Sequence, residues 1–157
     1  MKRKLLVLSV LLTLTTSAMA ETYTNSFIAN VFAEKDQERG VASNAERKQQ
    51  LLEMTQRTTK QCHNNLAKGQ EAENIGNMIV ATRQKLDAAD ITITHYELLD
   101  VVYSILGDGK TNWNCSSVLA MYMVLRMPAD GNRGLTHLAA YKTVQAGRDS
   151  GLLGQAN

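Results

Sequence analysis

The sequence predicts one small all-α domain of about five helices, held by one disulfide and preceded by an N-terminal signal peptide. Three observations lead to this prediction. Apolar residues recur every three or four positions over most of the chain after residue 20, which is the period of an amphipathic helix. Strand-like alternation is confined to residues 91–94, which are too few for a sheet. The chain has only two cysteines, Cys62 and Cys115.

The first twenty residues have the pattern of a secretory signal peptide. Basic residues at positions 2–4 precede an apolar stretch over residues 5–14, and Ala18 and Ala20 provide the small residues of a cleavage site. We expect cleavage after Ala20 and a periplasmic or secreted protein. The apolar stretch is about half as long as a membrane-spanning helix, so we expect no stable membrane span after cleavage.

Removal of the signal peptide changes the charge of the protein. The leader carries three of the 17 basic residues and none of the 15 acidic ones, which leaves 14 basic against 15 acidic residues. Nucleic acids and anionic membranes select a basic excess or stripe, so we expect neither as a partner. The remaining 137 residues suffice for one core. We place it at residues 43–147, followed by a flexible end over residues 148–157.

Residues 21–42 are expected to form a short helix and a charged connection. Apolar residues at helical spacing place the helix over residues 27–33. The charged run over residues 34–39 is expected to stay in solvent, because it has no apolar face to dock on a core. The alternative is that residues 21–42 are an arm bound by a partner.

The first long helix of the core is expected to begin at Ser43. Ser43 and Glu46 have the spacing of a capping box, in which both side chains accept hydrogen bonds from free backbone N–H groups. The apolar stripe of this helix repeats at steps of three and four residues and includes Cys62, which therefore faces inward. Gly69 is expected to end the helix.

Two further helices are expected over residues 71–88 and 95–106. The first has acidic residues at its start and basic residues near its end, as the helix dipole favours. At the start of the second, Thr94 and Glu97 repeat the capping-box spacing. The high apolar content of residues 95–106 predicts burial on more than one side.

The last two helices are expected over residues 115–127 and 135–146. Asn112 or Asn114 can cap the first of them, and Pro128 stands just after its end. Its apolar content predicts that it is the central helix of the core.

Cys62 and Cys115 are predicted to form a disulfide that joins the first long helix to the start of the helix over residues 115–127. An exported protein enters an oxidising compartment, where such pairs form and persist. Both cysteines are expected to face the core, and no third cysteine competes. The chain-entropy model values a loop of this length at about 4 kcal/mol. Two separate buried thiols are the alternative.

No cofactor is expected. Gly-Lys-Thr at residues 109–111 resembles the end of a phosphate-binding loop, but Ser104 stands where that motif has its first glycine. The loop also follows a helix rather than a strand, so we expect no nucleotide. We expect no metal, because the three histidines lie on different helices without metal-ligand spacing. They are His63, His95 and His137.

The loop over residues 107–114 is the expected contact surface. Its glycines place Asp108, Lys110 and Trp113 between two core helices. Trp113 is the leading contact residue, because large amphipathic aromatics dominate interface energetics. The alternative is that Trp113 packs over the disulfide.

These observations favour a non-enzymatic periplasmic protein-interaction module with a protein partner in the cell envelope. In architecture the chain resembles the small, helical, disulfide-bearing immunity proteins that neutralise cell-wall-degrading toxins of type VI secretion. This resemblance implies an inhibitor or immunity protein against an envelope-targeting toxin. An accessory factor of a secretion, conjugation or envelope system is a second hypothesis. A small cell-wall hydrolase with Glu97 as its acid is a third, and a homodimer is left open.

Overall fold

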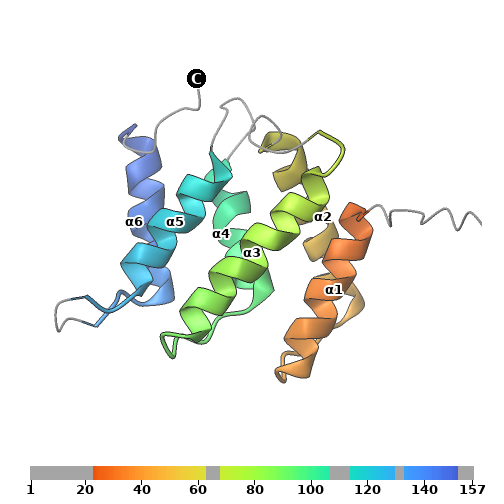
Figure 1. Ribbon diagram of the computed structural model, residues 1–157, viewed down its shortest axis with the longest axis horizontal. Helices are drawn as coiled ribbons and strands as arrows, with labels where there is room; N and C mark the ends of the chain where they lie inside the picture. Colours follow the sequence, from red (N-terminus) through yellow and green to blue (C-terminus); the bar gives the residue numbers. More distant parts are fainter. Residues whose placement is uncertain (1–22, 63–67, 107–113, 130–132, 152–157) are drawn as a thin grey trace, which may run out of the picture.

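The computed structural model of the protein describes residues 23–62, 68–106, 114–129 and 133–151. Within these ranges the chain forms helices and no β-strand, which confirms the predicted all-α class, with six helices rather than about five. They are α1 (Asn25–Glu38), α2 (Ala45–Gln61), α3 (Glu71–Asp87), α4 (His95–Leu106), α5 (Cys115–Arg126) and α6 (His137–Asp149) (Figure 1).

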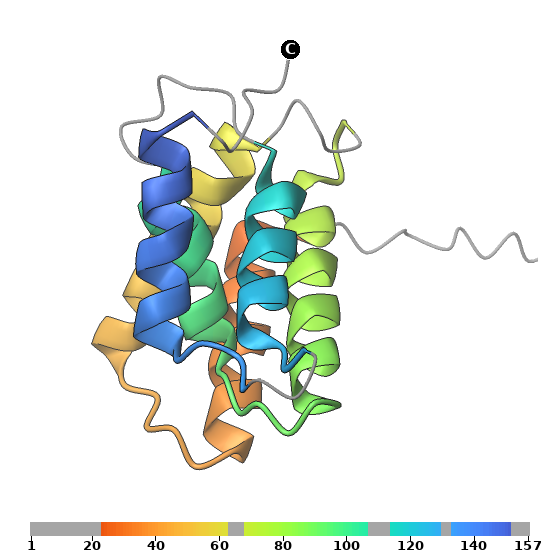
Figure 2. The same cartoon turned by 90° about the vertical axis from the view of Figure 1, so that its left-hand side faces the viewer.

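The helices lie in two layers, with α1, α3 and α5 in one and α2, α4 and α6 in the other (Figures 1 and 2). α4 packs against each of the other five helices, so it is the central helix of the core. The burial predicted for α4 on more than one side is confirmed. The apolar pattern predicts the central role for residues 115–127 instead, and this prediction is wrong. α5 leaves one side to solvent, where Ser116, Ala120 and Val124 are exposed.

Side-chain caps explain where several helices begin. The predicted capping box at α4 is confirmed: the Glu97 N–H donates to Thr94 Oγ1 at 3.0 Å, and the Thr94 N–H donates to Glu97 Oε2 at 2.8 Å. Asn114 caps α5, as expected. α2 is capped by Asn44, whose Oδ1 accepts from the Arg47 N–H at 2.8 Å. The predicted cap at Ser43 is therefore one residue off, because asparagine is an equally good cap.

α1 is longer than predicted, because the charged run over residues 34–39 continues the helix to Glu38 instead of forming a connection. The run is exposed, as predicted, except for Asp36. The helix covers Asn25–Glu38, and Asp36 within the charged run is only 1% exposed. Its carboxylate accepts hydrogen bonds from the backbone N–H groups of His95 and Tyr96 at the start of α4. The free N–H groups of a helix N-terminus attract a carboxylate, so a residue 59 positions away along the chain becomes a second cap of α4.

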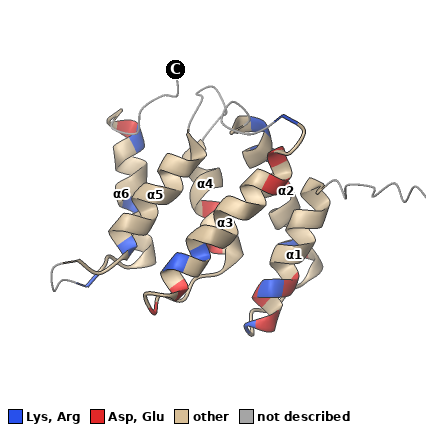
Figure 3. Ribbon diagram, viewed as in Figure 1, with Lys and Arg blue, Asp and Glu red and all other residues tan. Residues whose placement is uncertain are grey.

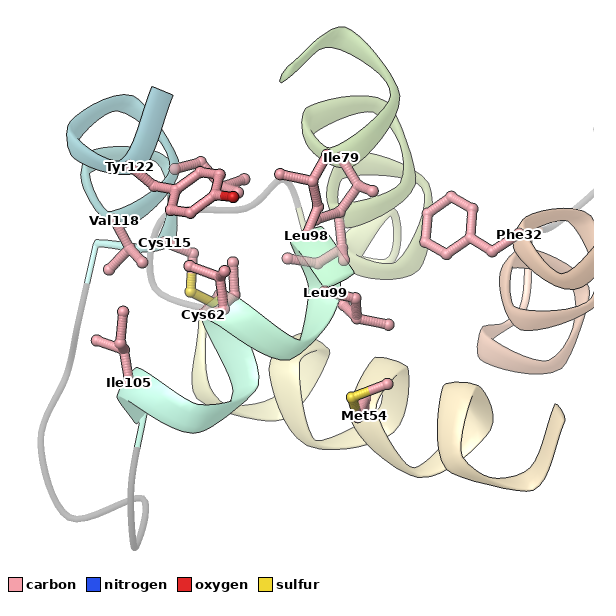
Figure 4. Close-up of a cluster of buried hydrophobic side chains, with 14 of the residues drawn as sticks. Phe32, Met54, Cys62, Ile79, Leu98, Leu99, Ile105, Cys115, Val118 and Tyr122 are labelled. Carbon is pink, nitrogen blue, oxygen red and sulfur yellow. A yellow bond between two sulfur atoms is a disulfide. The ribbon is translucent and has the colours of Figure 1, made fainter. Parts of the chain in front are cut away.

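The predicted disulfide is confirmed. Cys62 and Cys115 are bonded, and their Cα atoms are 5.8 Å apart, within the usual range for a disulfide. Both residues are buried, and Figure 4 shows the bond beside α4, among the apolar side chains of the core. The bond ties the residue after α2 to the first residue of α5, so it closes a loop that contains α3 and α4.

The two ends of the chain extend beyond what the structure describes. The predicted signal peptide, residues 1–20, lies outside the described residues, and so do residues 152–157 of the expected flexible end. α6 covers His137–Asp149, two to three residues later along the chain than expected. None of the described helices has both the length and the apolarity that crossing a membrane requires.

Candidate binding site

The contact loop expected over residues 107–114 lies outside the described residues except for Asn114. Asp108, Lys110 and Trp113 all lie outside the described residues. The described residues form a cleft at the other end of α4 and α5, where the connection from α3 to α4 faces the end of α5 and residues 133–135 before α6. This cleft has a volume of about 590 Å³. Asp90 and Thr92 line it from the first connection.

The opposite wall of the cleft is formed by the end of α5 and the segment before α6. Arg126, Arg133 and Leu135 line this wall. The Leu135 N–H donates to the Leu125 carbonyl at 2.8 Å, which holds the segment against α5. Gly134 lies so close to α5 that a Cβ atom at this position would overlap the backbone oxygen of Arg126. Only glycine allows this approach.

The first wall is shaped by the way α3 ends. The Ile91 N–H donates to the Leu86 carbonyl at 2.9 Å, and Asp90 has a left-handed φ of 58°. This is the Schellman ending of a helix, with aspartate in the position that glycine most often takes. Aspartate tolerates this backbone conformation better than most residues. Both walls therefore consist of backbone held by defined hydrogen bonds.

A buried polar cluster lies behind the cleft and joins α5 to α6. The Tyr122 hydroxyl oxygen is 2.7 Å from Nδ1 of His137, and Arg126 Nη1 donates to it at 3.1 Å. Because arginine can only donate, the hydroxyl oxygen accepts from Arg126. The direction of its hydrogen bond with His137 depends on which ring nitrogen of the histidine carries the proton. Burial raises the pKa of Tyr122 to about 12, with Arg126 opposing the rise and Glu97 adding to it. The Tyr122 hydroxyl is therefore neutral at physiological pH.

The same cluster fixes Arg126 in the cleft wall. Its guanidinium carbon lies 5.8 Å from the centre of the Tyr122 ring. Its Nε is shielded from solvent and has no hydrogen-bond partner among the described residues. A guanidinium has five N–H groups, and Tyr122 accepts from one of them. Arg126 thus has donors that the described residues leave unused.

Exposed apolar side chains gather on the same helices. Five large apolar residues are exposed in the described part of the chain, and three of them belong to α5, α6 or the segment before α6. They are Val124 (70% exposed), Leu138 (59%) and Leu135 (40%). The other two, Tyr23 and Phe27, lie at the start of α1. We name the set Val124, Arg126, Arg133, Leu135 and Leu138 the α5–α6 surface.

Glu97, the acid of the hydrolase hypothesis, has a structural role. Its Oε2 accepts from both the backbone N–H and the hydroxyl of Thr94, each at 2.8 Å. The carboxylate is thereby held against the start of α4.

The histidines are not brought together. His63 lies outside the described residues, and His137 belongs to the Tyr122 cluster. His95 is buried, with Nδ1 2.8 Å from Asp36 Oδ1 and its ring stacked on Phe32 at 4.9 Å. Among the described residues no group of three or more histidine, cysteine or acidic side chains could hold a metal ion.

The Asp36–His95 pair and the Tyr122 cluster were not predicted from the sequence. Tyr122 and Arg126 stand four positions apart, and residues at this spacing are neighbours on a helix face. This spacing is the sequence pattern from which their contact could have been predicted. Nothing local connects Asp36 with His95. Burial raises the pKa of Asp36, but the hydrogen bonds from the His95 side chain and from two backbone N–H groups outweigh it and hold the pKa below its usual value of 3.8.

Acidic and basic residues are both distributed over several helices in Figure 3. The α5–α6 surface combines two arginines and Leu135, which line the cleft, with Val124 and Leu138, which are exposed on α5 and α6. In comparisons with known proteins, no family model, no curated protein and no solved structure matched this chain.

Proposed function

We propose that this protein is an exported, non-enzymatic binding protein that holds a protein partner of the cell envelope on its α5–α6 surface. Two observations carry the proposal. Two arginines and the exposed Leu135 line one cleft, and Val124 and Leu138 are exposed on α5 and α6, the helices on either side of the segment that forms its wall. Arginine and apolar side chains are typical of the parts of an interface that bind most strongly. An inhibitor or immunity protein against an envelope-targeting toxin is the form of this function that we favour.

The disulfide supports export. Disulfides form and persist in oxidising compartments such as the bacterial periplasm and are rare in the cytosol. The Cys62–Cys115 bond is buried in the core, where it has a structural rather than a reactive setting. The leader pattern of residues 1–20 supports the same route. An intact-mass measurement of the exported protein tests it, with cleavage after Ala20 as the expected result.

Polar side chains inside the fold form hydrogen bonds with one another and with the backbone, which also supports a binding rather than a catalytic role. Asp36 and Glu97 both accept hydrogen bonds at the start of α4. Tyr122 and His137 bond to each other between α5 and α6. Each of these groups has a partner that explains its position through the stability of the fold.

Site-specific photo-crosslinking in the periplasm tests the proposal. A photoreactive amino acid is placed at Val124 or at Leu138, and at exposed Asn77 on α3 as the matched control. We expect the same crosslinked protein from positions 124 and 138 and none from position 77. Equal crosslinking from all three positions, or from none, would contradict the proposed surface.

The hydrolase hypothesis is tested on the purified mature protein with cell-wall fragments. We expect no product from the wild type or from Glu97→Gln. Product that disappears in Glu97→Gln would overturn the non-enzymatic proposal.

A further inference from the structure

We infer that the cleft of the α5–α6 surface receives an acidic side chain of the partner, with its carboxylate bound by Arg126 and Arg133. This inference rests on the proposed function, because it names the chemistry of the partner segment at the same surface. The charge of the lining points to it, because the lining contains two arginines and only one carboxylate, that of Asp90. A guanidinium matches a carboxylate through two parallel N–H donors.

The two arginines differ from most others in the described residues, because neither is neutralised within the fold. Arg39 and Arg83 each lie within 3.2 Å of the Asp87 carboxylate, and Arg148 lies 2.7 Å from Asp149. Among the described residues, no acidic side chain lies within ion-pair distance of Arg126 or Arg133. Their positive charge is therefore available to a ligand.

Arg126 is also held in place before any ligand arrives. Its hydrogen bond to Tyr122 ties the guanidinium to a fully buried ring. A preorganised donor loses less conformational entropy on binding. Arg133 lines the same wall and its side chain is exposed. One arginine is thus fixed and the other is free to close on a carboxylate.

The remaining lining favours a protein side chain over a phosphate group. Ile91, Pro128 and Leu135 make part of the cleft apolar, which suits the methylene groups of glutamate and an apolar neighbour in the partner. Phosphates are commonly held by backbone N–H groups at helix N-termini. Near the cleft, one such group in each of α4 and α6 already has a side-chain acceptor: the Glu97 N–H donates to Thr94, and the Ala139 N–H donates to Thr136.

Nuclear magnetic resonance titration with matched peptides tests this inference. The probes are N-acetylated, C-terminally amidated Leu-Glu-Leu and its neutral counterpart Leu-Gln-Leu, and inorganic phosphate is a third probe. We expect the glutamate peptide to shift the backbone amide signals of Ile91, Gly134 and Leu135 saturably at millimolar concentration. The glutamine peptide and phosphate should bind these positions at least tenfold more weakly.

Substitution of the exposed arginine provides the matched variant. We expect Arg133→Gln to weaken binding of the glutamate peptide about tenfold, since it removes a charged hydrogen-bond donor. Lys142→Gln, at an exposed position of α6, should leave this binding unchanged. Equal binding of both peptides, tighter binding of phosphate, or equal affinities of Arg133→Gln and wild type would overturn the inference. If crosslinking at positions 124 and 138 succeeds while the peptides fail, only the carboxylate chemistry is wrong. If the peptides bind while crosslinking fails, the proposed partner surface is wrong.

Discussion

At the scale of single residues, Asp36 shows how one carboxylate can connect two helices. It is buried at the end of α1 and accepts hydrogen bonds from His95 and Tyr96 at the start of α4. Arg47 lies 3.8 Å from the same carboxylate. These partners favour the ionised form, so the pKa of Asp36 is lower in the folded protein than in the unfolded chain.

The lowered pKa predicts how stability depends on pH. The contribution of Asp36 to the free energy of unfolding is fully present above its usual pKa of 3.8 and is lost as the pH falls through its lower folded-state value. In Asp36→Asn this contribution is absent at every pH, and we expect the free energy of unfolding to fall by about 2 kcal/mol at neutral pH. Denaturant unfolding over a pH series measures both effects, with exposed Glu38→Gln as the control.

If the free energies of unfolding of Asp36→Asn and the wild type differ by the same amount down to strongly acidic pH, the prediction is wrong. It would mean that Asp36 has the same pKa in the folded and the unfolded state.

At the scale of helices, the contact between α5 and α6 depends on a polar group in an otherwise apolar setting. Tyr122 is fully buried, and its hydroxyl links Arg126 on α5 to His137 on α6. The Leu135 N–H bond to the Leu125 carbonyl holds the preceding segment. The cleft wall is thus built by hydrogen bonds between elements that are adjacent in the sequence.

Tyr122→Phe tests this link, because it keeps the ring and removes only the hydroxyl. We expect the free energy of unfolding to fall by about 1 to 2 kcal/mol, since Nδ1 of the half-buried His137 and an N–H of Arg126 lose their partner. Tyr141→Phe is the matched control, because Tyr141 is half-buried and, within the described ranges, its hydroxyl accepts a hydrogen bond from Gln145 on the same helix and makes no link between helices. Thermal and denaturant unfolding of both variants measure the difference. Equal losses for the two would show that the Tyr122 hydroxyl has no special role.

At the scale of the whole molecule, the core is organised around α4 and closed by the disulfide. Leu99 on α4 lies in the buried cluster of Figure 4 and has no solvent exposure. The bond between Cys62 and Cys115 ties α2 to α5 across this core.

Placing a charge in this core is expected to abolish folding. Leu99→Asp buries a carboxylate without a partner, which costs several kcal/mol against a total stability of about 5 to 15 kcal/mol. Leu138→Asp is the matched control, because the same change at a 59% exposed position of α6 leaves the carboxylate in water. Circular dichroism and thermal melting compare the two. A Leu99→Asp variant that melts like the wild type would contradict the buried position of α4.

Loss of the disulfide is expected to lower stability by about 2 to 4 kcal/mol. Alkylation of the unfolded, unreduced protein should label neither Cys62 nor Cys115, and reduction should lower the melting temperature. The double variant Cys62→Ser with Cys115→Ser should show a similar loss without any reductant. Stoichiometric labelling before reduction would refute the bond.

The sequence by itself determined what depends on neighbours a few positions apart. The helical period, the capping box of Thr94 and Glu97 and the cap at Asn114 all involve residues within four positions, so the fold class and most helix starts could be predicted. The pairing of Cys62 with Cys115 followed because the chain offers no other cysteine.

Only the tertiary structure decided which distant groups meet. A charged run predicts solvent exposure, yet Asp36 is buried because the N-terminus of α4 supplies donors that no local pattern reveals. The cleft likewise brings Asp90 together with Arg126, at the end of α5, and with Arg133, in the segment before α6. Its shape depends on the close approach of Gly134 to α5. Such contacts arise from the packing of whole helices, which local periodicity does not specify.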